Sequence, residues 1–304
     1  MISQTTDYLK LHFIVWIWGF TAILGMLITI PAVEIVFYRT FIAFITLGVI
    51  LYLRNSNFRI GKNDVLKILG TGVIISGHWI LFFAAARVST VSVCLAGIAT
   101  CSLWTSFLEP LMNKKKIKGF EVVLGLIVIF GLYVIFRFEF NHALGLGMAI
   151  LSAFLASLFS VINGKFTQRH NPYIITFYEM LGACLGTVAF FPIYALYFAK
   201  DGVLNLIPTS MDWVWLLILA IICTVYAFSV SVEIMKRISA FVVNLTVNLE
   251  PVYGIILAVI IFGEKEQMQP GFYLGTFIIL LSVLAYPVLN KMNKRKPQPV
   301  DNLR

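Results

Sequence analysis

The chain has 304 residues, of which 60% are hydrophobic and only 12% are charged, and its net charge is +9. Soluble domains are about 45–50% apolar and about 25% charged. One soluble core could not hide this much apolar surface, so membrane lipid must cover part of it. The positive charge does not indicate a nucleic-acid partner, because the basic residues are scattered through short loops between apolar segments.

Ten apolar segments follow one another along the chain, each near the ~20 residues that a membrane-spanning helix needs. They are 9–30, 32–53, 65–86, 90–112, 120–136, 144–162, 172–198, 212–233, 239–262 and 270–290. Backbone groups in lipid must be paired within their own segment, so these spans are expected to be helical. The predicted fold is an all-α integral membrane protein with ten transmembrane helices.

Lysine and arginine are distributed unequally between the two sides of these spans. With the N-terminus in the cytoplasm, 18 of the 23 basic residues lie on the cytoplasmic side, and the five others are Arg39, Arg87, Arg137, Lys200 and Lys265. Cytoplasmic loops carry an excess of Lys and Arg. The sequence therefore predicts a multi-pass protein of the inner (plasma) membrane with both termini in the cytoplasm.

Part of the sequence repeats at a fixed offset. Residues 87–131 align with residues 237–281 without a gap, so that Arg87 matches Arg237. Because five helices is an odd number, two five-helix copies must lie in the membrane with opposite orientations. The predicted organisation is a first five-helix repeat over 1–143, a second over 144–290 and a basic cytoplasmic tail over 291–304. Inverted repeats are typical of transporters that open alternately to each side.

The second half carries a run of short motifs. Arg237-Ile238-Ser239-Ala240 is followed by Leu249-Glu250-Pro251 and then by Phe262-Gly263-Glu264. This run resembles the EamA-like family of the drug/metabolite transporter superfamily, and the resemblance covers nearly the whole chain. The first half departs from the pattern, since Thr100-Cys101 stand where the repeat would place Glu250-Pro251. The resemblance implies a transporter whose relatives often carry amino acids and related metabolites outward.

The ninth span holds the strongest candidates for a solute-binding site. Ionisable groups inside spans are costly and are functional candidates by default. Glu250 lies about midway along the span, where Pro251 removes a backbone donor and loosens the helix. Asn244 and Asn248 share another face of that helix. Solute contact and an interhelical polar clamp both remain open for Asn248 and Glu250.

Other polar and aromatic residues lie inside further spans. His78 and Trp79 are adjacent in the third span, so only one is expected to face a cavity. Trp79 and Tyr226 are candidate solute contacts, and His78 is a candidate for proton coupling or for a hydrogen bond within the bundle. Arg39 and Glu179 occupy matching positions in the two copies and suggest an ion pair or two separate gates.

Motifs for enzymatic chemistry are absent from the sequence. It contains no GxxxxGK[ST] loop, HExxH or GxSxG, and no cofactor is predicted. The predicted function is secondary-active transport, by alternating access, of small metabolites such as amino acids or their derivatives, with export as the expected direction. Protons are a candidate coupling ion. A passive channel and a membrane-embedded enzyme are the alternatives, and the oligomeric state stays open.

Overall fold

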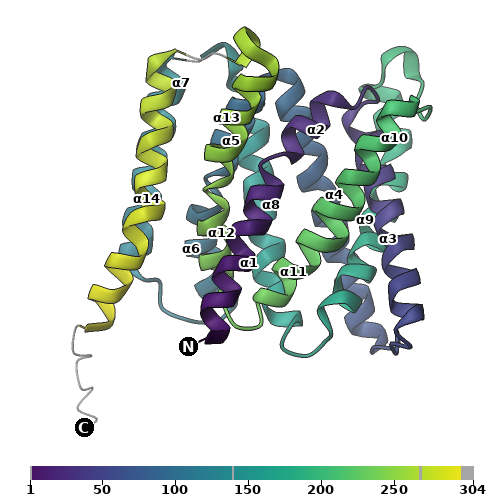
Figure 1. The fold of residues 1–304 in the computed structure, drawn as a ribbon, viewed down its shortest axis with the longest axis horizontal. Helices are drawn as coiled ribbons and strands as arrows, with labels where there is room; N and C mark the ends of the chain where they lie inside the picture. The colour runs from purple at the N-terminus through teal and green to yellow at the C-terminus, as the bar shows by residue number, and fades with distance from the viewer. Residues whose placement is uncertain (1, 139, 267–268, 296–304) are drawn as a thin grey trace.

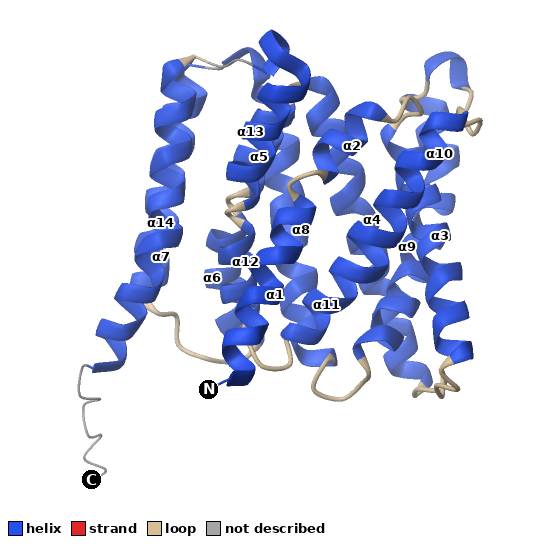
Figure 2. Cartoon of the chain, in the orientation of Figure 1, coloured by secondary structure: helices blue, strands red, loops and turns tan. Residues whose placement is uncertain are grey.

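A computed structural model describes residues 2–138, 140–266 and 269–295 of the chain. The described residues form helices joined by short loops, and most of these helices run side by side across the molecule (Figures 1 and 2). This arrangement satisfies backbone groups within each helix, as a bilayer requires. Part of the predicted basic tail, from residue 296 onward, lies outside the described residues.

Ten crossings of the bundle confirm the predicted fold class. Six are single helices: α3 (Ala32–Leu53), α4 (Lys62–Val88), α7 (Gly119–Phe138), α8 (Ala143–Phe166), α9 (Pro172–Tyr197) and α14 (Pro270–Arg295). The other four are composite and consist of α1 (Ile2–Trp18) with α2 (Thr21–Leu27), α5 (Val91–Ile98) with α6 (Cys101–Met112), α10 (Ser210–Leu217) through η3 (Ile218–Tyr226) to α11 (Ala227–Ile234), and α12 (Ala240–Val247) with α13 (Glu250–Phe262). Eight crossings are long and apolar enough to span a membrane, and the apolar parts of α7 and α14 are shorter.

The direction of the chain alternates from one crossing to the next. α14 ends on the same side of the bundle as α1 begins (Figure 1). The fifth crossing, α7, and the sixth, α8, are joined on the opposite side by the short 3-10 helix η1 (Phe140–His142). The second set of five crossings therefore begins where the first set ends, and the two sets have opposite orientations.

Three crossings are interrupted near their middles, at residues 19–20, 99–100 and 248–249. At each break a backbone N–H bonds the carbonyl oxygen three residues earlier in place of four, as in Phe20 N to Ile17 O at 3.2 Å and Asn248 N to Leu245 O at 3.2 Å. Pro251 lacks an N–H group and accounts for the third break. The predicted spans over 9–30 and 90–112 are each made by two helices, α1 with α2 and α5 with α6. Gly19 lies in the first of these breaks, and no proline lies at either.

Glycines allow the interrupted helices and their neighbours to approach closely. A Cβ atom on Gly254 of α13 would overlap Leu95 of α5 and would lie 3.0 Å from the Gly19 carbonyl oxygen. Gly182 of α9 lies against the Leu69 backbone of α4 in the same way. Small residues at such crossings permit backbone contact between membrane helices. The breaks in the first, fourth and ninth crossings thus come together at one depth of the bundle.

Candidate solute-binding cavity

A cavity lies where these interrupted crossings meet, and side chains from both repeats line it. The volume of this cavity is about 80 Å³. Its polar lining comprises Thr21, Arg39, His78, Ser160, Asn163, Ser231, Asn244 and Glu250, and its aromatic lining comprises Trp18, Trp79, Phe82, Phe159 and Phe228. Asn163 lies near the end of α8, and Met235, another lining residue, follows the end of α11. The cavity therefore extends toward the side of the bundle at which α1 begins.

Arg39 supplies the positive charge of the cavity wall. It lies on α3 with 2% of its surface exposed. Its Nε donates a 2.7 Å hydrogen bond to the Thr224 hydroxyl, and its guanidinium carbon lies 3.8 Å from the centre of the Trp79 ring. Thr224 belongs to η3, which is a π-helix, and π-helices often occur at functional sites. The guanidinium is thus held by Trp79 of the first repeat and by Thr224 of the second.

Glu250 supplies the carboxyl group of the same wall. It is the first residue of α13 and is 5% exposed. The positive end of the helix dipole favours a carboxylate at this position. Thr21, beside the break in the first crossing, is a polar neighbour of this carboxyl group, and Arg39 lies within electrostatic range. The ion pairs within the described residues join other groups, so Arg39 and Glu250 face one cavity without a direct salt bridge.

His78 and Trp79 both line the cavity, which differs from the expectation that only one would face it. The His78 Nδ1 atom lies 2.7 Å from the Ser152 hydroxyl and 2.9 Å from the Ser152 carbonyl oxygen. The His78 ring also packs edge-on against Phe159, with centroids 5.4 Å apart. His78 therefore joins α4 to α8 while one side of its ring remains part of the cavity wall.

Asn244 of α12 and Asn248, which follows the end of that helix, have different surroundings. Asn244 lines the cavity, donates to the Thr105 hydroxyl at 2.8 Å and accepts from the Ser160 hydroxyl at 3.2 Å. Asn248 is 0% exposed, donates to the Ser102 hydroxyl at 2.8 Å and does not belong to the cavity lining. Both side chains bind α12 to α6, as an interhelical clamp would.

Tyr226 and Glu179 lie away from the cavity wall. Tyr226 is 45% exposed and meets Phe13 edge-on at 6.4 Å, on the outer surface of the bundle. Glu179 is buried on α9, and within the described part of the chain neither of its carboxylate oxygens has a hydrogen-bonding partner. Arg39 and Glu179 consequently form no ion pair, although they occupy matching positions in the two copies.

Several further residues line the cavity. Trp18 donates through its indole nitrogen to the Cys223 carbonyl oxygen at 3.1 Å, which joins the end of α1 to the π-helix. Thr21, Ser160 and Asn163 also line the cavity. Asn163 lies one residue beyond the predicted span 144–162, and α8 continues past it to Phe166. The π-helix at Thr224 has no evident sequence signal.

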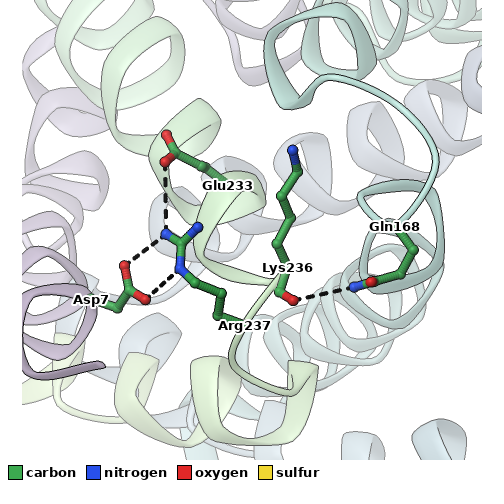
Figure 3. Close-up of polar contacts among 5 residues, drawn as sticks. All are labelled: Asp7, Gln168, Glu233, Lys236 and Arg237. Carbon is green, nitrogen blue, oxygen red and sulfur yellow. Dashed lines mark hydrogen bonds and ion pairs between the residues drawn. The ribbon is translucent and has the colours of Figure 1, made fainter. Parts of the chain in front are cut away.

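Two arginines at repeat-equivalent positions hold opposite ends of the first crossing. On the side where α1 begins, Arg237 donates to both carboxylate oxygens of Asp7 at 2.6 and 2.7 Å, and Glu233 lies 3.7 Å away (Figure 3). The Asp7 carboxylate raises the pKa of Arg237 above its usual value by accepting these bonds. At the other end, Arg87 donates to the carbonyl oxygens of Gly25 and Ile28 at 3.0 and 2.8 Å.

A ten-crossing inverted repeat with a charged cavity at its centre has the architecture of a multi-pass membrane transporter. The EamA-like transporter family model matches residues 8–137 and again residues 143–286. The chain belongs to this family, within the drug/metabolite transporter superfamily, and its members are transporters rather than enzymes. The predicted family membership is confirmed, and so is the broad prediction of a membrane transporter.

Similarity to individual proteins agrees with this assignment. The chain is 22% identical over 274 residues to the uncharacterized transporter YxxF of Bacillus subtilis (strain 168), an alignment that covers 88% of this chain and 85% of that protein. A solved crystal structure superposes with a TM-score of 0.69 at 15% sequence identity. That superposition covers 94% of this chain and 98% of the other, and it supports the fold alone.

Proposed function

We propose that the chain is a secondary-active transporter that exports a small zwitterionic metabolite, such as an amino acid or a derivative, by alternating access. The observation that carries this proposal is the presence of Arg39 and Glu250 in the wall of one cavity. A planar guanidinium fits a carboxylate, and a carboxylate fits an ammonium group. Trp79, Phe159 and Phe228 would contact the apolar part of such a solute.

Within this proposal the other candidate residues have different roles. Asn244 would offer its amide to the polar end of the solute, because it lines the cavity. His78 would act in gating, and Arg39 would do so in addition to binding the solute, since each joins two helices at the cavity wall. Asn248 and Tyr226 stay predictions without a place in that wall.

Alternating access is supported by the two inverted repeats and by interrupted helices at the depth of the cavity. The cavity extends toward the end where the chain begins, and several bonds close the opposite end. There Asp212 accepts from the Thr29 hydroxyl at 2.6 Å and Arg87 binds the end of α2. The proposed orientation places both termini in the cytoplasm of the inner (plasma) membrane, so the accessible side would be the one from which an exporter is loaded.

The test is counterflow in liposomes that contain the purified full-length protein. Radiolabelled L-leucine serves as the first probe, followed by a panel of other amino acids, acetylated amino acids, sugars and organic cations. We expect saturable uptake of a zwitterion that unlabelled solute inside the vesicle accelerates. Glu250→Gln should lower this uptake at least about tenfold, which corresponds to a loss of about 1.4 kcal/mol, because the ammonium group loses its counter-charge.

Glu264→Gln is the matched control, since it makes the same chemical change at an exposed carboxylate. It should transport like the wild-type protein. Flux that neither saturates nor responds to solute on the other side would indicate a channel and contradict the proposal. Equal uptake by Glu250→Gln and wild type would remove Glu250 from the site.

A further inference from the structure

A buried carboxyl group without a partner lies beside the cavity. Glu179 is 0% exposed, and among the described residues nothing hydrogen-bonds to either of its carboxylate oxygens. Asn163 of α8 is the neighbouring polar side chain, and both of its amide atoms likewise have no bonding partner there. Asn163 lines the cavity, whereas Glu179 does not. The amide therefore stands between the cavity and the carboxyl group.

Five charged or titratable groups on the helices around α9 have other partners. Arg39 on α3 bonds Thr224, His78 on α4 bonds Ser152, Glu233 on α11 contacts Arg237, Lys165 on α8 bonds the Met112 carbonyl oxygen, and Asp64 at the start of α4 pairs with His170. None of these groups compensates a negative charge on Glu179. An ionised carboxylate here would have lost its hydration without gaining a partner.

We propose that Glu179 binds the coupling proton of the transport cycle. This inference rests on the proposed function and adds its coupling ion. In the conformation described, the proton resides on a carboxylate oxygen of Glu179. When a conformational change admits water past Asn163, the proton passes to that water, and the Asn163 amide donates a hydrogen bond to the carboxylate that remains. A buried carboxyl group that alternates in this way is a recurring proton relay in membrane transporters.

A proton fits this site better than a metal cation does. Sodium, calcium and magnesium need several oxygen ligands around one point. The described residues contain no group of three or more His, Cys, Asp or Glu side chains that could hold a metal ion. A proton needs only the carboxylate itself.

The first test reads the proton directly and does not depend on a solute. Infrared spectra of the full-length protein in liposomes, recorded in D2O, report the carbonyl stretch of a protonated carboxyl group. We expect the wild-type protein to show such a band at neutral pH and Glu179→Gln to lose it. Glu264→Gln, at an exposed carboxylate, should keep the band. A spectrum of Glu179→Gln identical to that of wild type would overturn the assignment.

The second test separates coupling from transport. Glutamine mimics the protonated side chain, so Glu179→Gln should fold and should retain L-leucine exchange at equal pH. It should lose the acceleration of L-leucine transport that an imposed pH gradient gives the wild-type protein. Glu250→Gln should instead lose exchange and gradient-driven transport together, because it removes a solute contact.

The outcomes distinguish this inference from the proposed function. Gradient-driven transport that survives in Glu179→Gln, or a dependence on sodium in place of pH, would overturn the coupling role even if the infrared band is present. A wild-type protein that transports no solute of the panel would contradict the proposed function and with it the coupling, while the infrared band alone would still decide where the proton resides.

Discussion

Arg39 is a cation inside a membrane protein, and its neighbours explain how the fold tolerates it. Its Nε atom is bonded to Thr224 of the second repeat, and its guanidinium lies over Trp79 of the first. A cation over an aromatic ring gains roughly 2 kcal/mol or more when both groups are away from water. The orientation of this charge therefore depends on contact between the two halves.

Replacing Trp79 by leucine should weaken the binding of L-leucine by about tenfold, because the guanidinium loses the ring that orients it. Isothermal titration of the purified protein measures this change. Trp16→Leu is the matched control, since Trp16 is 45% exposed on the outer surface of α1 and should leave the dissociation constant unchanged. An unaltered constant in Trp79→Leu would show that the ring does not orient Arg39 for solute.

Among the helices, the crossing of α2, α5 and α13 fixes the position of the breaks. Gly254 lies against Leu95, which is 0% exposed, and against the Gly19 carbonyl oxygen. The Gly19 position is equally tight, because a Cβ there would lie 2.9 Å from the Tyr253 Cβ. Overpacking such a contact displaces backbone as well as side chains.

Gly254→Ala should therefore destabilise the protein by about 1–3 kcal/mol and lower its thermal transition temperature in detergent. Gly147→Ala provides the comparison, because no atom lies within 4 Å of a Cβ at that position of α8. Alanine is the better helix former by about 1 kcal/mol, so this second variant should be as stable as wild type or slightly more stable. Equal transition temperatures for both variants would contradict the close crossing.

The sequence predicted the helices well because apolar length is a local property. The three helix breaks differ in whether a proline in the sequence marks them. Pro251 is a local signal, and the interruption at 248–249 lies beside it. The interruptions at 19–20 and 99–100 have no proline; the first contains Gly19, which packs against Gly254 of α13. The pattern of residues along the chain cannot predict a contact between segments so far apart in the sequence.

The candidate site likewise has residues that the sequence could predict and residues that it could not. Single intramembrane charges such as Arg39 and Glu250 are visible in a sequence because they are rare there. Their partners are not, since the Arg39–Thr224 bond joins residues 185 positions apart through a π-helix. His78 and Trp79 also show the limit of helical periodicity, because a wide cavity contacts more than one face of α4.

At the scale of the whole molecule, the two matching arginines bind the first crossing at opposite ends of the bundle. Arg237 binds Asp7 near the start of α1, and Arg87 binds the carbonyl oxygens of Gly25 and Ile28 near the end of α2. The break at 19–20 lies between them. Since the repeats are inverted, equivalent residues act at opposite ends, which is the arrangement that alternating access requires.

Weakening one of these contacts should open its own end of the bundle. Spin labels on cysteines introduced at Lys10 and Arg169 report the end where α1 begins, and labels at Ile207 and Glu264 report the other end. The four native cysteines are buried, so labelling would be confined to the introduced sites. Asp7→Asn should lengthen the distances of the first pair, because an amide replaces one arm of a bidentate ion pair.

Arg87→Gln should lengthen the distances of the second pair and leave the first pair short, because α2 loses the donor that holds its final carbonyl oxygens. A ligand or a mutation shifts a two-state equilibrium only through a difference in its interactions with the two states. Opening of a different end by each variant would mean that each contact restrains its own end of the bundle. A shift in the same direction, or general loosening at both ends, would make the arginines simple stabilisers of the fold and would leave alternating access to depend on other contacts.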